Sequence, residues 1–318
     1  MDRHRKLLIV IIVLLLVMAG VGFVVYHRIA EPARAVLLLP DGNFLLYVNL
    51  SPAHIFDLGP MPNETDPEYQ DFIQNTGFHF EKDLDTVAVS FKEINDRDPQ
   101  PSVVLVGHFD QNRLANYLHG RASGTETYKD KSIFVIHHGN DLVRACLLDS
   151  STVAITIMQS ADSMHQIIDR SLGSESSGPP LMQYYQYVPF GSLAWLMLRA
   201  PEDMPTKTVV PGVDADFLKN TVSILSVRYT GSIRIKLDII SQTDERAKQV
   251  QEAANTLLAF ARMGGESLGP GGPDKDVKSV FDNIQVQQAG RQTTISAVIP
   301  QAFVQKMAEK IKNPKSPQ

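Results

Sequence analysis

Two pairs of closely spaced residues carry side chains that could do chemistry. Asp83 and Asp85, two positions apart at the start of an expected strand, would share one face and could act as an acid/base pair. His137 and His138 are adjacent, and neighbours on a strand point to opposite faces, so they would chelate one ion only if the chain turns there. Each pair also has a plainer interpretation, as solvated carboxylates at a strand start and as ordinary strand-end histidines. We therefore predict no catalytic, cofactor-binding or metal-binding residue.

A zinc site remains conceivable, because His108, His119 and His165 add three further imidazoles elsewhere in the chain. Several signatures of well-known enzyme and metal sites are missing. The sequence has no Ser-x-x-Lys, His-Glu-x-x-His, EF-hand loop or paired-cysteine motif. The glycine-rich stretch 264–272 lacks the Gly-Lys-Ser/Thr ending of a phosphate loop and follows a helix instead of a strand.

Cys146 and Trp195 are predicted to be core residues. Cys146 is the only cysteine, so no intrachain disulfide is available, and it lies in the apolar run 145–148. Trp195 lies in the apolar run 193–198. We therefore favour a core position for its side chain over a role as a stacking surface for a ligand.

The elements that would position these residues are strands in pairs, each pair or small group followed by a helix. Period-two alternation is clearest at 225–229 and 233–239, which indicates one wet and one packed face. Asp110, Ser160 and Thr243 each begin a helix as its N-cap. The other expected strands are 44–50, 86–91, 102–109, 132–137, 142–148, 152–158, 192–198, 284–288 and 293–299, and the expected helices are 110–119, 160–172, 243–263 and 300–311.

This pattern predicts an α+β fold, with antiparallel sheets built from repeated strand-strand-helix units and helices packed on one face. The Gly-, Ser- and Pro-rich segment 174–180 is the expected linker between two similar halves, 36–173 and 181–313. Residues 314–318 are expected to be a disordered tail.

The longest apolar stretch of the sequence is 7–26, which has no charged residue and would span a bilayer as one helix. A cleaved signal peptide is the alternative, but the apolar run continues past the small residues Val17 and Ala19 that could mimic a cleavage site. Val21 stands where a lipoprotein would need its cysteine. We expect a cytoplasmic tail at 1–6, an uncleaved transmembrane anchor at 7–26 and a tether at 27–35.

The distribution of charge indicates the orientation of the chain and excludes two classes of partner. Basic residues are denser before the anchor than after it, which favours an N-terminus inside and residues beyond the anchor outside the cytoplasm, with the protein in the cell inner (cytoplasmic) membrane. Residues 1–34 carry +3 of the net −5, so the remainder carries −8. Such a surface suits neither nucleic acid nor anionic lipid.

Several short motifs follow one another along residues 36–312: Gly77–Val87, Gly107–Asp110, Tyr128 with Ile133–Val135, Leu147–Asp149 with Val153–Ala154, Ile167–Arg170, Trp195 and Ser226–Gly231. Together they resemble a family of uncharacterised bacterial envelope proteins. The resemblance implies an N-terminal membrane segment followed by a duplicated α+β region of unknown function. It implies no catalytic residues.

We therefore expect a single-pass membrane-anchored extracytoplasmic protein that is a binding or structural component of the cell envelope. Its expected partners are the membrane, through 7–26, and envelope proteins or polymers. One alternative is a membrane-tethered carrier of a lipid or another apolar ligand, and a second is an envelope hydrolase. The sequence does not indicate an oligomeric state or a cofactor.

Overall fold

The computed structural model describes residues 32–52, 66–92, 100–139, 141–175, 177–202, 215–267 and 282–303. Contacts divide the chain into residues 1–34 and a compact unit of residues 35–318. The predicted anchor, both predicted tails and all but the end of the tether lie outside the described residues, as does most of the predicted helix 300–311. Within the described part, no helix is both long and apolar enough to cross a membrane.

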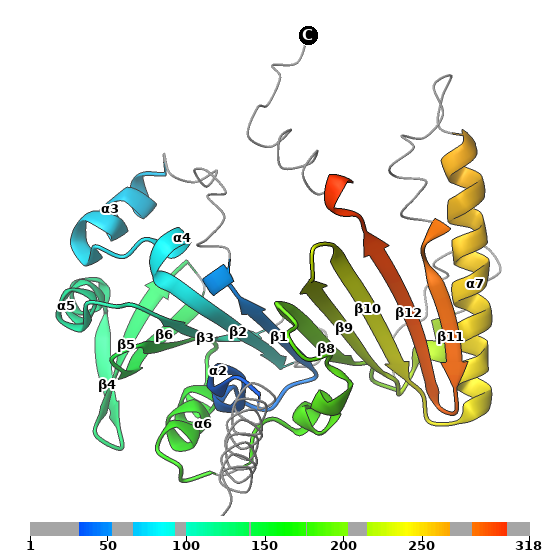
Figure 1. Ribbon diagram of the computed structural model, residues 1–318. Helices are drawn as coiled ribbons and strands as arrows, with labels where there is room; N and C mark the ends of the chain where they lie inside the picture. The colour runs from blue at the N-terminus through cyan, green and yellow to red at the C-terminus, as the bar shows by residue number, and fades with distance from the viewer. Residues whose placement is uncertain are drawn as a thin grey trace, which may run out of the picture. The chain divides into compact units, whose positions relative to one another are not determined.

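One antiparallel sheet of 12 strands organises the described residues, in the order β11-β12-β10-β9-β8-β1-β2-β3-β7-β6-β5-β4 (Figure 1). This confirms the predicted α+β class and the antiparallel pairing. The strands are β1 (Phe44–Asn49), β2 (Leu84–Lys92), β3 (Gln100–Gly107), β4 (Gly124–Tyr128), β5 (Lys131–His138), β6 (Asp141–Asp149), β7 (Thr152–Ile157), β8 (Ala194–Arg199), β9 (Val222–Tyr229), β10 (Ile233–Ile240), β11 (Gln285–Ala289) and β12 (Gln292–Ile299).

Two of the helices begin at the predicted caps, and a third begins one residue later than predicted. Asp110 accepts a hydrogen bond from the Arg113 backbone N–H at 3.1 Å, and the Thr243 hydroxyl accepts from the Arg246 backbone N–H at 3.3 Å. Ser160 precedes the actual cap residue, Ala161, and its hydroxyl accepts from the Asp162 backbone N–H at 3.1 Å. The helices are α2 (Arg34–Leu38), α3 (Pro67–Thr76), α4 (Phe80–Asp83), α5 (Gln111–Arg121), α6 (Asp162–Ser171) and α7 (Asp244–Ser267), with 3₁₀ turns η2 (Pro180–Tyr187) and η3 (Ala215–Leu218).

The sheet is continuous across the predicted linker 174–180, because β1 and β8 pair directly at its centre. The chain enters η2 at Pro180, and Leu181 within η2 is only 1% exposed. The two predicted halves therefore contribute strands to one sheet, whereas the sequence led us to expect more than one antiparallel sheet.

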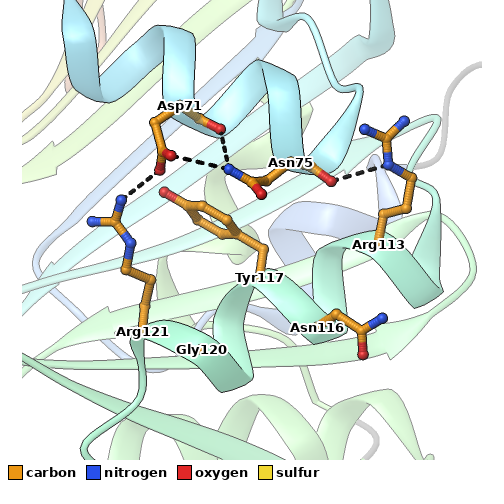
Figure 2. Close-up of a pocket in the computed structure, with 7 residues that line it drawn as sticks. All are labelled: Asp71, Asn75, Arg113, Asn116, Tyr117, Gly120 and Arg121. Atoms are coloured by element: carbon orange, nitrogen blue, oxygen red, sulfur yellow. Dashed lines mark hydrogen bonds and ion pairs between the residues drawn. The ribbon is translucent and has the colours of Figure 1, made fainter.

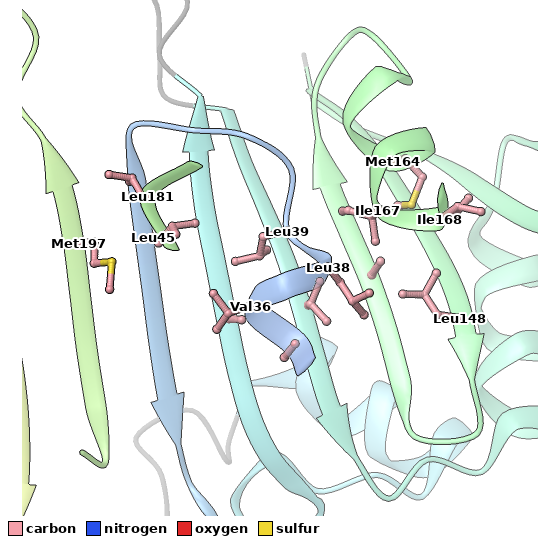
Figure 3. Packing of buried hydrophobic residues seen from close by; sticks show 14 of the residues in the cluster. Val36, Leu38, Leu39, Leu45, Leu148, Met164, Ile167, Ile168, Leu181 and Met197 are labelled. Carbon is pink, nitrogen blue, oxygen red and sulfur yellow. The ribbon is translucent and has the colours of Figure 1, made fainter. Parts of the chain in front are cut away.

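A hydrophobic core covers one face of the sheet, which we call the core face (Figure 3). Alternate residues of the strands point into it. They meet apolar side chains from α2, η2 and α6, and together these residues include Val36, Leu39, Leu45, Leu148, Met164, Ile167, Ile168, Leu181 and Met197. Full burial of an aliphatic side chain of this size contributes about 1.5–3 kcal/mol, so this layer fixes the centre of the sheet.

Helices lie on both faces of the sheet, and the prediction that they pack on one face was wrong. On the core face α6 contacts β6 and β7, where Cys146 is buried. On the opposite face α5 contacts β5 and β6, where Phe134 and Ala145 are buried. On that face α7 also lies against β12, where the Thr293 hydroxyl donates to the Ala247 carbonyl at 2.8 Å. Strands β5 and β6 carry apolar residues on both of their faces, so both faces must be covered there.

Candidate functional site

The carboxylates Asp83 and Asp85 do not form a matched pair on one strand. Asp83 ends α4, where its carboxylate accepts from the His79 backbone N–H at 2.7 Å. Asp85 is the second residue of β2 and lies 3.5 Å from the His108 imidazole. Asp83 is therefore engaged in closing the turn that leads into the strand, which is the plainer of the two predicted interpretations.

The histidines named from the sequence lie in different settings. His137 and His138 end β5 and are exposed, and His119 is in the last turn of α5. The His165 ring stacks on Tyr128 with a centroid distance of 3.9 Å. The structure does not bring these side chains together, and within its described residues no three metal-ligating side chains form a group that could hold an ion.

Cys146 and Trp195 are core residues, as predicted. Trp195 is 3% exposed and stacks on Tyr47 with a centroid distance of 5.6 Å. Cys146 is fully buried, and burial raises the pKa of its thiol to about 11. A thiol with that pKa is neutral and unreactive at neutral pH.

A polar cleft of about 370 Å³ lies between α3 and α5 (Figure 2). The Arg121 guanidinium pairs with the Asp71 carboxylate at 2.5 Å, and the Asn75 side-chain amide donates to that carboxylate at 3.0 Å. Tyr117 lies between these groups, with Arg121 over its ring at 5.2 Å. Burial raises the pKa of the Tyr117 hydroxyl, and the nearby Arg121 opposes this change.

Arg113 closes the other end of this cleft and caps α3. Its guanidinium donates to the carbonyls of Asn75 at 3.0 Å and Gln74 at 2.7 Å, which are free at the helix C-terminus. Gly77 follows in the left-handed conformation (φ 71°), and a Cβ there would meet the Arg113 guanidinium. Since these groups are engaged in joining α3 to α5, we assign the cleft a structural role.

A second cleft, of about 430 Å³, lies beside α6 and is lined by Asp41, Asp162, Ser163, His165, Gln166 and Asp169. Two of its three acidic residues have basic partners, because Asp169 pairs with Lys129 at 2.7 Å and Asp41 with the Arg170 guanidinium at 2.8 Å. Arg170 is buried and also donates to the Leu39 carbonyl, so it ties α6 to the segment after α2. The third, Asp162, is exposed in the first turn of α6. Most of the negative charge of this cleft is thus neutralised within the fold.

The opposite sheet face carries a set of apolar side chains in two parallel rows. The strand register aligns one row of seven residues across β12, β10, β9, β8, β1, β2 and β3, and a second row beside it. The first row consists of Ala297, Ile235, Val227, Ala194, Val48, Val87 and Leu105, and the second of Ile295, Leu237, Leu225, Leu196, Leu46, Val89 and Val103. We call these residues the apolar face.

All residues of the apolar face are half-buried. The second row continues along the register through Ile155 to Ala145 and Phe134, and there α5 buries the last two. At the other end, Thr293 is buried under α7. Leu198, beside Leu196 on the same face of β8, is 41% exposed. The apolar face therefore retains solvent contact between two regions of the same sheet surface that helices bury.

The core face of β10 and β12 is polar where the apolar face lies behind it, whereas the core face of β9 carries the fully buried Ile224. Asp238 is completely buried there and accepts from the Thr294 hydroxyl at 2.7 Å and the Gln292 amide at 2.8 Å. The Lys236 ammonium pairs with the same carboxylate at 2.7 Å. On β10, the apolar Leu237 is thus less buried than the charged Asp238, which reverses the usual arrangement.

Sequence reasoning missed both α3 and the apolar face. α3 had a detectable signal, since Asp66 caps it, Pro67 occupies its first position and Gly77 ends it. The apolar face had a weaker signal in the sequence, because β8 is apolar at both parities, which indicates that both faces of that strand avoid water.

Comparisons with known proteins show similarity to solved structures only in the fold. No protein-family model and no curated protein matches this sequence. Two solved structures of TP0453 are similar to it. Crystal form IV has 11% sequence identity and a TM-score of 0.48, with 88% of this chain and 96% of that chain covered. Crystal form III has 10% identity and a TM-score of 0.47, with 88% and 99% covered.

Proposed function

We propose that this protein is a single-pass membrane-anchored component of a bacterial cell envelope, and that it binds a partner through the apolar face. The anchor at 7–26 would hold residues 35–318 outside the cytoplasm. This assignment combines the predicted membrane segment and the resemblance to envelope proteins with the apolar face, a surface of the described residues that lies outside the hydrophobic core. The binding role depends on that feature.

The apolar face is the observation that carries the proposal. At about 4.8 Å between strands, seven strands give it a width of about 30 Å. Its fourteen side chains, all aliphatic, keep partial contact with water. Contiguous apolar surface on this scale is rare on monomeric proteins unless a partner or ligand covers it. A polysaccharide is a poor fit, because aliphatic side chains offer its hydroxyl groups no hydrogen bonds.

The matching partner is therefore an apolar surface on another envelope protein. A second candidate, a carrier of a lipid or other apolar ligand, is favoured by the purely aliphatic composition of the two rows. The two candidates differ in what would accompany the purified chain, since a carrier would retain an extractable lipid and a docking component would retain a protein.

We also infer that the fold arose by internal repetition. On either side of the β1–β8 pair, the chain follows the same course. It forms three neighbouring antiparallel strands, then a helix, and then further strands, the last of which pairs with the third strand. The units are β1-β2-β3 with α5 and β4–β7, and β8-β9-β10 with α7, β11 and β12. The apolar face extends across the junction of the two units.

The test is crosslinking of the full chain in native membranes, followed by purification and identification of the attached proteins and lipids. The comparison uses Leu196→Lys, in the centre of the apolar face, and Leu172→Lys, at a leucine that is 48% exposed at the end of α6. We expect Leu196→Lys to lose the attached molecule and Leu172→Lys to retain it. Equal capture by both variants would contradict the proposal.

Orientation has its own test. Alkaline phosphatase folds to an active enzyme only outside the cytoplasm, and it would be fused after residue 318. The expected result is an active fusion. A stably expressed but inactive fusion would reverse the assigned orientation.

A further inference from the structure

Two arginines lie directly opposite each other on the hairpin that β9 and β10 form (Figure 1). Arg228 of β9 pairs in register with Arg234 of β10, and Arg228 is four residues from the buried Ile224, so both side chains are on the core face. Directly opposed residues have Cβ atoms about 4.5–5.5 Å apart, and like charges at that distance are destabilising. The fold therefore holds two guanidinium groups side by side at a cost to its own stability.

No acidic side chain among the described residues neutralises this arginine pair. The Arg228 guanidinium has no hydrogen bond or ion pair within the described part of the chain, and Arg234 donates to an uncharged group, the Thr230 hydroxyl, at 3.1 Å. The acidic residue on the same face of β10 is Asp238, four positions from Arg234 and so about 13 Å along the strand. Its carboxylate is already bound by an ammonium, a hydroxyl and an amide group.

The surrounding strands concentrate positive charge in a chain that is otherwise acidic. β8, β9, β10 and β12 carry one acidic residue, Asp238, and four basic residues: Arg199, Arg228, Arg234 and Lys236. Residues 35–318 as a whole carry a net charge of −8. The rest of the chain would therefore repel a nucleic acid or an anionic membrane surface, whereas one small anion could reach the pair.

The charge and the geometry of the pair indicate which anion fits. Two guanidinium groups carry +2, which matches the charge of about −1.5 to −2 of a phosphoryl group at neutral pH. A single carboxylate would neutralise one of the two groups. Each guanidinium also presents a planar fork of N–H donors, which can bond two oxygens of a phosphate at once. Arg234 is exposed and Arg228 is half-buried, so a ligand can reach both side chains.

We propose that Arg228 and Arg234 form a binding site for the phosphoryl group of a small molecule. The two guanidinium groups bind its oxygens from neighbouring strands, and the phosphoryl group supplies the negative charge that the pair lacks. The site is on the core face, whereas the apolar face is on the other side of the same strands. The inference therefore goes beyond the proposed function and stands independently of it.

Isothermal titration calorimetry of the full chain in detergent tests the site, with inorganic phosphate as the probe. Acetate at equal ionic strength is the singly charged comparison. Arg228→Gln and Arg234→Gln each remove one guanidinium. The matched control is Arg291→Gln, at an exposed arginine in the turn between β11 and β12.

We expect phosphate to bind the unmodified chain and Arg291→Gln equally, and at least about tenfold more tightly than acetate does. Arg228→Gln and Arg234→Gln should each weaken phosphate binding at least about tenfold, because each removes charged hydrogen-bond donors. Equal affinity for acetate and phosphate, equal affinity in all variants, or no saturable binding would overturn the site. Binding only in micelles that contain phosphatidic acid would also overturn it, since the ligand would then be a membrane lipid.

A charge reversal tests whether the arginine pair is unfavourable in the free protein. Arg234→Glu places a carboxylate opposite Arg228, so we expect its Tm without phosphate to be higher than that of the unmodified chain. Phosphate should then raise the Tm of the unmodified chain but not that of Arg234→Glu. A lower Tm for Arg234→Glu without phosphate, or an equal response of both chains to phosphate, would overturn the inference.

Discussion

Leu46 of β1 lies directly opposite Leu196 of β8, and both side chains are half-buried on the same face of the sheet. This pair joins two strands that are far apart in the sequence, and it lies in the middle of the second apolar row. The centre of the apolar face therefore coincides with the centre of the fold. A substitution here affects the proposed binding surface and the junction between the two parts of the sheet together, so each test of binding needs a stability measurement beside it.

Arg170 should be important for stability, because its side chain is only 3% exposed and binds both Asp41 and the Leu39 carbonyl. We expect Arg170→Ala to lower the free energy of unfolding by about 3 kcal/mol. Asp41→Ala removes only a half-exposed partner and should cost less than about 1 kcal/mol. Urea unfolding of both variants checks this, and equal effects would mean that the carboxylate, not the buried guanidinium, is the important group.

Asp238 allows a graded test of a buried polar network. Asp238→Ala leaves the Thr294 hydroxyl and the Gln292 amide without their acceptor, and we expect a loss of about 2–3 kcal/mol. Asp238→Asn retains an accepting oxygen and loses mainly the pairing with Lys236, so its loss should be smaller. Thermal unfolding measures both, and an Asn variant as unstable as the Ala variant would show that charge dominates.

Cys146 should resist alkylation in the folded protein. At pH 8 we expect iodoacetamide to modify it at least about 100-fold more slowly than an exposed thiol introduced by Leu172→Cys, because the raised pKa and burial both suppress the thiolate. Comparable rates, measured by mass spectrometry of the intact chain, would contradict the burial of the thiol.

The same thiol predicts a dependence of stability on alkaline pH. Its pKa rises from the ordinary value of 9.0 to about 11 on folding. Below pH 9 the thiol is neutral in both states, and between pH 9 and 11 the unfolded chain ionises first, so stability falls as pH rises. The free energy of unfolding should fall by up to about 2–3 kcal/mol more than in Cys146→Ala over that interval. If the free energy of unfolding falls equally with pH in the unmodified chain and in Cys146→Ala, the predicted contribution of the thiol is wrong.

Arg113 should hold α3 in place. Arg113→Ala removes the two hydrogen bonds to the last carbonyls of α3, and we expect amide exchange in residues 67–76 to accelerate about tenfold, for a loss of about 1–2 kcal/mol. Arg121→Ala, which breaks the half-exposed pair with Asp71, should have a smaller effect. Hydrogen exchange with mass spectrometry compares the two, and a larger effect of Arg121→Ala would reverse their assigned importance.

Most strands could be predicted because their apolar residues alternate or run together. The clean alternation of 225–229 and 233–239 identified β9 and β10, and the caps at Asp110, Ser160 and Thr243 located α5, α6 and α7. β4 was missed because Gly124–Tyr128 is a polar edge strand, without the apolar alternation that a packed face requires.

Long-range pairing could not be predicted from local patterns. The β1–β8 contact depends on register between distant segments, and strand periodicity contains no information about which strands become neighbours. The two-sided burial of β6, with Ala145 and Cys146 both buried, was present in the sequence as a continuous apolar run. The prediction of helices on one face did not take this run into account, so helices on the opposite face were not expected.

The most direct test of the apolar face as a binding surface is site-specific photocrosslinking in native membranes. A photoreactive amino acid replaces Leu196 in one strain and Leu172 in another, and adducts are identified by mass spectrometry. The account predicts an adduct between position 196 and a separate molecule, a protein or a lipid, and little or none at position 172. If position 196 forms no adduct with another molecule, or only one that position 172 forms equally well, the apolar face is not the binding surface.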